Sequence, residues 1–208
     1  MPAPDLAELV APGHTAVLIQ EVQEGVVGRS SALPALAEVA RRTGAIDNVA
    51  RLAAAARRAS VPVIHLTAES LGGGFGANRN ARLFGGARRA GAVNTPGSDA
   101  VAPLPQTGPE PGDLVIPRWH GLSPFTGTQL DSLLRNEGIS TVVVVGVSLN
   151  VAIPNMVFDA VNRAYQVVLA TDAVAGVPEE YGRLVIEHTL ALLTTLTTTD
   201  ALASIWAH

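Results

Sequence analysis

An uninterrupted apolar run stands out at residues 141–147, where four consecutive valines are followed by a glycine and a fifth valine. A half-exposed strand would alternate apolar and polar residues, whereas this run is apolar throughout and mostly β-branched. That pattern is typical of a strand at the buried centre of a parallel sheet. Shorter apolar runs predict further strands over residues 61–66 and 166–170.

Between these strands the apolar residues recur at helical spacing. Helices are expected over Leu33–Ala40, Ile46–Arg58, Thr128–Asn136 with Thr128 as N-cap, Asn155–Ala164 and Pro178–Leu196. Strands that alternate with helices predict right-handed crossovers and an α/β fold. We therefore expect a three-layer αβα domain with a mostly parallel, Rossmann-like central sheet, preceded by an extended arm over residues 1–14.

The chain shows no internal repeat and no linker, so we expect one domain over residues 1–208. Residues 71–112 are poor in regular pattern and rich in glycine and proline. A loop of that length in a compact domain is usually functional or mobile. A lid over a site and a flexible insertion both fit this segment, and we favour the insertion.

Composition narrows the chemistry. A hydrophobic content of 48% with 15% charged residues fits a folded globular protein, and the net charge of −4 gives no reason to expect nucleic acid or an anionic membrane as partner. Cysteine is absent and all 14 basic residues are arginine, which excludes thiol catalysis and Schiff-base chemistry. The longest apolar run is far shorter than the ~20 residues of a membrane span, and no signal peptide is visible, so we expect a cytoplasmic protein.

The apolar run at 141–147 leads into the sequence GVSLNVAIPN at 146–155, which carries a family resemblance. This turn resembles the nucleophile turn of the isochorismatase-like cysteine hydrolases, in which a strand runs into Gly-Val-Ser/Ala-x-Asn/Asp-x-Cys. Other segments resemble the family in the same order along the chain: TAVLIQEVQ at 15–23, VPVIHL at 61–66, GDLVIPR at 112–118, SPFTGTQL at 123–130 and YQVVL at 165–169.

The resemblance implies three site positions. Family members use an Asp-Lys-Cys triad, and on this chain Glu21 takes the aspartate position, Arg118 the lysine position and Ala152 the cysteine position. All three residues differ from the family pattern. The turn also implies a cis peptide bond, here between Val147 and Ser148.

Ligands of parallel sheets bind beyond the carboxyl ends of the strands, where Glu21, Arg118 and Ala152 are expected. A neighbouring arginine favours the ionised form of Glu21, which opposes its use as an acid, and the same arginine could hold a substrate carboxylate with two hydrogen bonds. An ordinary salt bridge between Glu21 and Arg118 fits equally well. We expect the turn to bind substrate through Ser148, Asn150 and Val151, where backbone amides meet a helix N-terminus.

Other residues carry weaker expectations. Trp119, His120 and Phe125 follow Arg118 and fit either the wall of an apolar pocket or the packing of a loop. His65 fits either a side chain that faces the site or a core histidine, and we favour the core; we interpret His188 as structural. Some family members carry an Asp-x-His metal site after the second strand, which the residues at 68–70 do not reproduce, so we expect no metal and no cofactor.

Two functions remain open. Cysteine-free members of the family hydrolyse the vinyl ether of isochorismate, with the acidic residue as proton donor, and this chain could act in that way on a small carboxylate-bearing ether. Alternatively, all three changed positions fit a protein that has lost catalysis and binds a small carboxylate or supports an assembly. The family tendency and the few charges also predict a homodimer or homotetramer.

Overall fold

The valine-rich run forms the centre of the structure. In the computed structural model, which describes residues 5–89 and 94–207, strand β4 covers Thr141–Val147 and every residue in it is buried. Alternate side chains face opposite layers: Val143, Val145 and Val147 enter one core, while Val142 and Val144 enter the other. Both faces of the strand are covered, as the absence of polar alternation predicts.

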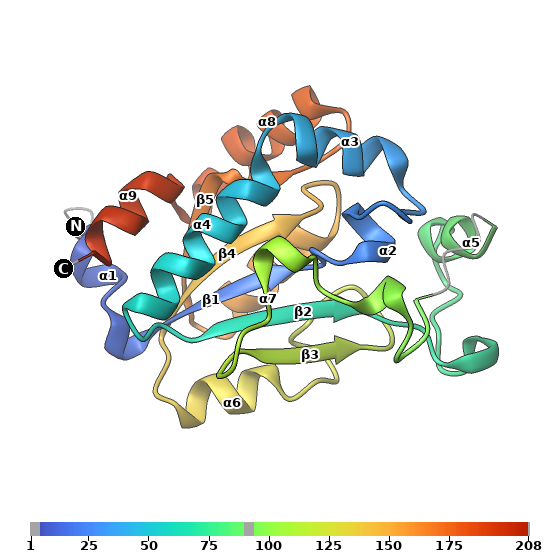
Figure 1. Cartoon of the computed structure of the whole chain (residues 1–208), viewed down its shortest axis with the longest axis horizontal. Coiled ribbons are helices and arrows are strands. Elements are labelled where there is room, and N and C mark those ends of the chain that lie inside the picture. The colour runs from blue at the N-terminus through green and yellow to red at the C-terminus, as the bar shows by residue number, and fades with distance from the viewer. Residues whose placement is uncertain (1–4, 90–93, 208) are drawn as a thin grey trace.

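Six strands form one sheet in the order β3-β2-β1-β4-β5-β6, and every neighbouring pair is parallel. The strands are β1 Thr15–Gln20, β2 Val63–Ala68, β3 Leu114–Arg118, β4, β5 Gln166–Ala175 and β6 Thr195–Thr197. Helices lie on both faces of the sheet, which confirms the three-layer α/β fold (Figure 1).

The helices vary from one turn to fourteen residues. They are α1 Leu6–Leu9, α2 Glu24–Val27, α3 Pro34–Arg42, α4 Ala45–Arg58, α5 Arg82–Arg89, α6 Leu130–Asn136, α7 Ala152–Asn162, α8 Glu179–His188 and α9 Thr199–Ile205. The cores divide them: α4 and α9 pack with α3 on one face of the sheet, and α6 and α7 cover the other. In Figure 1 the strands β2 and β3 point toward α5, at the opposite end of the molecule from the two termini.

One glycine is required where β4 passes β1. Gly146 has φ 105°, and a Cβ atom there would lie 2.2 Å from the carbonyl oxygen of Gln20. The two strands therefore approach each other too closely at this point for any side chain. This contact brings the end of β1 beside the turn that follows β4.

Several expected elements differ in the structure. The arm over 1–14 is wrong within the described residues, since Asp5 caps the short helix α1 by accepting a hydrogen bond from the Ala7 amide; residues 1–4 lie outside the described residues. The helix expected to reach Leu196 ends at His188, because the threonine-rich end of that segment pairs with β5 as strand β6. His188 is exposed rather than buried in a helix face.

Smaller shifts concern the boundaries. Helix α7 begins at Ala152, three residues before the expected start, because Pro154 fits the first turn of a helix. Strand β5 continues five residues past its expected end at Ala170. Helix α6 begins at Leu130 with Gln129 at the N-cap, although the Thr128 hydroxyl still accepts a hydrogen bond from the Leu130 amide.

Candidate functional site

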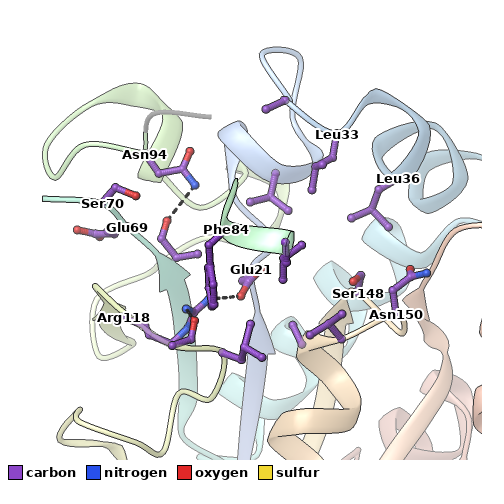
Figure 2. Close-up of a pocket in the computed structure, with 18 of the residues that line it drawn as sticks. Glu21, Leu33, Leu36, Glu69, Ser70, Phe84, Asn94, Arg118, Ser148 and Asn150 are labelled. Carbon is purple, nitrogen blue, oxygen red and sulfur yellow. Dashed lines mark hydrogen bonds and ion pairs between the residues drawn. The ribbon is translucent and has the colours of Figure 1, made fainter. Parts of the chain in front are cut away.

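A pocket of about 560 Å³ opens at the carboxyl ends of the strands and is lined by Glu21, Arg118 and Ala152. Glu21 follows β1, Arg118 ends β3, and Ala152 begins α7 directly after the β4 turn. The parallel pairing of these strands brings the three positions to one edge of the sheet. The resemblance of separate segments thus points to residues that share a single cavity (Figure 2).

Glu21 has an unusual backbone for its residue type. Its φ of 53° places it in the left-handed region, and its amide donates to the Leu66 carbonyl at 2.9 Å. The Glu21 Oε1 atom accepts a hydrogen bond of 2.9 Å from Nε2 of the buried Gln20. Non-glycine residues in this region are uncommon and concentrate at functional sites.

Arg118 forms an ion pair with Glu21. The Nη2 atom donates to Glu21 Oε1 at 2.6 Å, and the side chains of Arg118 and Glu21 are only 12% and 15% exposed. The Nη1 atom donates to the carbonyl oxygens of His120 and Gly121. Because arginine stays protonated, Arg118 brings a fixed positive charge to the pocket. Contacts within the described residues engage three of the five guanidinium donors, and two remain.

The turn at Ala152 offers an amide to a ligand. The Ser148 carbonyl accepts hydrogen bonds from the amides of Val151 at 3.3 Å and Ile153 at 3.0 Å, and Pro154 has no amide hydrogen. Among the residues that the structure describes, the Ala152 amide is therefore the first-turn donor of α7 without a partner. The Val147–Ser148 peptide bond is cis, as the resemblance implies.

Asn150 lines the pocket but has a structural partner. Its side-chain amide donates to the Val177 carbonyl, and its Oδ1 atom accepts from the Val177 amide at 2.8 Å. This reciprocal pair ties the turn after β4 to the connection after β5. Ser148 and Val151 line the same pocket beside Ala152.

The segment after Arg118 divides between pocket and core. Trp119 and His120 line the pocket, as the pocket-wall interpretation expects. His120 lies against Gly127, where an added Cβ atom would be 2.6 Å from the imidazole ring. Phe125 instead lies in the core, where its ring centroid is 5.7 Å from that of Tyr165, so the packing interpretation describes this residue.

Several lining residues were not expected from the sequence. Glu69 and Ser70 follow β2, so the rule that ligands bind beyond strand ends could have identified them. Leu33 and Leu36 from the start of α3, and Phe84 from α5, form apolar walls. These side chains come from segments whose position depends on tertiary packing, and no local motif marks them.

His65 belongs to a different cluster. Its Nε2 atom lies 3.3 Å from Asp113 Oδ2, and Asp113 also accepts hydrogen bonds from Arg57 at 2.6 and 3.3 Å and from the Glu110 amide. Burial lowers the pKa of His65 despite the hydrogen bond to Asp113. For Asp113, burial alone would raise the pKa, but the bonds from Arg57 and the Glu110 amide outweigh it and hold the pKa below its usual value. This cluster joins α4 to the start of β3, in agreement with a structural histidine.

Metal-ligating side chains do not gather in the described part of the chain. Within 5–89 and 94–207, no three or more histidine, aspartate or glutamate side chains lie together in a way that could hold a metal ion. Over the same ranges, no helix is long and apolar enough to cross a membrane.

Known proteins resemble this chain in sequence. It is 31% identical over 176 residues to the ureidoacrylate amidohydrolase RutB of Methylobacterium radiotolerans, and the match covers 78% of this chain and 67% of that protein. A shorter match of 65 residues is 42% identical to the protein of the same name from Methylorubrum extorquens, and it covers 31% of this chain and 26% of the relative.

Solved structures share the architecture. The crystal structure of a cysteine hydrolase from Pseudomonas syringae pv. phaseolicola 1448A superposes with a TM-score of 0.83 at 23% identity, covering 100% of this chain and 99% of that one. The isochorismatase domain family matches residues 15–201, which include every strand of the sheet and Glu21, Arg118 and Ala152. The chain therefore belongs to the isochorismatase family of hydrolases.

Proposed function

We propose that this chain hydrolyses a small carboxylate-bearing ether without a side-chain nucleophile. The observation that carries the proposal is the Glu21–Arg118 ion pair of 2.6 Å in the pocket that also reaches Ala152. The pair keeps an acidic and a basic residue where the family resemblance expects an aspartate and a lysine. Amide hydrolysis, which the names of the RutB relatives state for those proteins, has no cysteine nucleophile here.

The substrate carboxylate would change the protonation of Glu21. In the resting site Glu21 forms an ion pair with Arg118, and an ionised carboxylate cannot donate a proton. A bound carboxylate would accept hydrogen bonds from the remaining Arg118 donors and would bring a second negative charge close to Glu21. Two carboxylates that share a site favour the uptake of one proton, so the substrate itself would convert Glu21 into an acid.

The reaction then balances without covalent catalysis. Protonated Glu21 donates its proton to the terminal carbon of a vinyl ether, and the double bond becomes an oxocarbenium ion. Water adds to the oxocarbenium carbon and returns a proton to Glu21. The resulting hemiketal breaks its bond to the alcohol oxygen, which takes up the hydroxyl proton, and a ketone and an alcohol leave.

Two features of the site support this assignment. The Ala152 amide at the N-terminus of the eleven-residue helix α7 is suited to donate to the alcohol oxygen, which gains negative charge as the hemiketal breaks. The left-handed backbone of Glu21 is a conformation that proteins retain chiefly where surrounding contacts impose it. A ligand at the strand ends accounts for both features better than the stability of the sheet does.

Isochorismate is the direct probe of the reaction. Pyruvate release, followed by coupled reduction with lactate dehydrogenase, should accompany incubation with the wild-type protein and should stop in Glu21→Gln. The exposed Glu137→Gln change serves as the matched control and should leave the rate unchanged. Binding of isochorismate without pyruvate release would contradict catalysis.

A binding protein without catalysis is the second candidate. The observation that favours it is the internal satisfaction of the pair, since Arg118 already donates to Glu21 and to two backbone carbonyls. In that case the pocket would take a small carboxylate and release it unchanged. Recovery of intact isochorismate after saturating incubation would favour this function.

A further inference from the structure

The polar groups of the pocket are unevenly available to a ligand. Three asparagines line it, and each makes a hydrogen bond to the main chain: Asn78 accepts from the Gly121 amide at 2.7 Å, Asn94 donates to the Ala68 carbonyl at 3.1 Å, and Asn150 pairs with Val177. These side chains hold the walls in place. Arg118 is the arginine among the lining residues, so it is the group best suited to hold an anionic head of a ligand.

The walls that α3 and α5 contribute are apolar. Leu33 and Leu36 come from the start of α3, and Leu83 and Phe84 come from α5. Figure 2 shows Leu33 and Leu36 on one side of the view, Glu69, Ser70 and Asn94 on the other, and Phe84 near Glu21 and Arg118. Leu33 is 49% exposed although it is a large apolar side chain. Exposed apolar side chains that gather around one cavity are typical of a surface that binds an apolar group.

The size of the pocket exceeds what a polar head needs. A carboxylate group fills roughly the space of two water molecules, or roughly 60 Å³. The pocket holds about 560 Å³, within the range of sites for small molecules with a substantial body. Most of the surface that lines this space is apolar and makes no hydrogen bond to a ligand.

We infer that the pocket takes an amphipathic ligand, with a carboxylate head at Arg118 and an apolar body between the start of α3 and α5. The head rests on the proposed function, whereas the body follows from Leu33, Leu36, Leu83 and Phe84. The substrate class is thus a carboxylate joined to an apolar chain or ring. Compact, wholly polar acids would leave the apolar walls in contact with water.

The direct test is a series of ligands with one head and a growing body. Linear alkanoates from acetate to octanoate, titrated by calorimetry into the wild-type chain, keep the carboxylate constant. Each added methylene should tighten the Kd about two- to fourfold, because a buried methylene gains most of its transfer free energy from water. The gain should stop when the chain fills the cavity.

Matched variants locate the body. Phe84→Ala should reduce the factor by which each methylene tightens the Kd to about one. Phe75→Ala is the control and should keep the wild-type factor, since Phe75 is 79% exposed on the same segment and does not line the pocket. Leu33→Ala tests the opposite wall, with the exposed Leu192→Ala as its control. Circular dichroism of each variant ensures that only folded proteins are compared.

The outcomes separate this inference from the proposed reaction. Equal Kd values along the series, no binding of octanoate, or the same gain in Phe84→Ala as in the wild type would overturn the inference. A chain-length gain without pyruvate release from isochorismate would uphold the ligand class and refute the reaction on that probe. Pyruvate release without a chain-length gain would do the reverse.

Discussion

Two arginine–carboxylate pairs in this chain have the same length and opposite surroundings. Arg118–Glu21 and Arg57–Asp113 each span 2.6 Å between nitrogen and oxygen. Asp113 is 5% exposed and accepts from Arg57, from the Glu110 amide and from His65, so both of its oxygens have partners within the protein. Glu21 accepts both of its hydrogen bonds on one oxygen and lines a cavity.

The difference shows that a short ion pair does not by itself mark a functional site. Arg57 joins the end of α4 to the segment before β3, and its pair with Asp113 has little room for a ligand. Glu21 and Arg118 meet at the carboxyl ends of strands, with hydrogen-bonding capacity left toward the pocket. We therefore expect Arg57–Asp113 to stabilise the fold and Glu21–Arg118 to bind a ligand, and four substitutions test this contrast.

Turnover should respond most strongly to a change at Glu21. Glu21→Gln removes the group that transfers the proton, so pyruvate release from isochorismate should fall about 100- to 10,000-fold. The free energy of unfolding in urea should fall by less than the ~3 kcal/mol of a broken buried pair, because the amide oxygen can still accept from Arg118 and Arg118 keeps its hydrogen bonds to the His120 and Gly121 carbonyls. A loss of stability larger than the loss of activity would place Glu21 with the structural pair.

The reverse pattern is expected at the other pair. Asp113→Asn removes the most buried carboxylate of the cluster, which is 5% exposed, and leaves Arg57 only its ion pair with the exposed Glu110; removing one partner of a buried pair costs about 3 kcal/mol. Urea denaturation measures this loss, and binding of octanoate by the folded protein should be unchanged. Glu110→Gln is the matched control, since Glu110 is exposed and its removal should cost less than about 1 kcal/mol.

The pH dependence of stability should also report the structural cluster. Burial lowers the pKa of His65 in the folded protein below 6.5, so the unfolded chain takes up this proton first. Neutral His65 contributes fully to the free energy of unfolding above pH 6.5. This contribution is lost as the pH falls from 6.5 through the pKa of His65 in the folded protein, by up to about 1.4 kcal/mol per pH unit. The lowered pKa of Asp113 adds a second loss below 3.8. His65→Gln should flatten the dependence of the free energy of unfolding on pH directly below pH 6.5. An unchanged dependence would mean that other groups cause it.

Removing the charge of the second carboxylate in the pocket should change ligand binding only slightly. Glu69 follows β2, lines the cavity and accepts from the Thr67 hydroxyl at 3.0 Å. Its negative charge opposes a carboxylate ligand, although solvent screens it, so Glu69→Gln should tighten octanoate binding about threefold. Calorimetry at low and high salt checks this, since the gain should shrink with salt. Weaker binding in the variant would mean that Glu69 contacts the ligand directly.

The sequence predicts the parts of this molecule that local pattern controls. The valine run of β4 has no polar residue to face water, so its central place follows directly from hydrophobicity. The resemblance of separate segments identified Glu21, Arg118 and Ala152, and the strand-end rule explains why they share a pocket.

Other parts depend on contacts between distant segments. Apolar residues continue at helical spacing past His188, yet pairing with β5 turns Thr195–Thr197 into strand β6. Phe125 follows Arg118 closely in sequence but turns away to pack on Tyr165. Phe84 lies in a segment without regular pattern and reaches the pocket only because the chain folds back over the strand ends. Local sequence carries no signal for such approaches.

In the proposed reaction a carboxylate ligand causes Glu21 to take up a proton, and proton uptake on binding measures this directly. Octanoate should be titrated at neutral pH by calorimetry in two buffers of different ionisation enthalpy, with wild type and Glu21→Gln. We expect uptake of up to one proton per ligand by the wild type and much less by Glu21→Gln, because Glu21 lies beside the carboxylate head at Arg118, whereas solvent screens the charge of Glu69. Binding to the wild type without proton uptake would contradict this expectation.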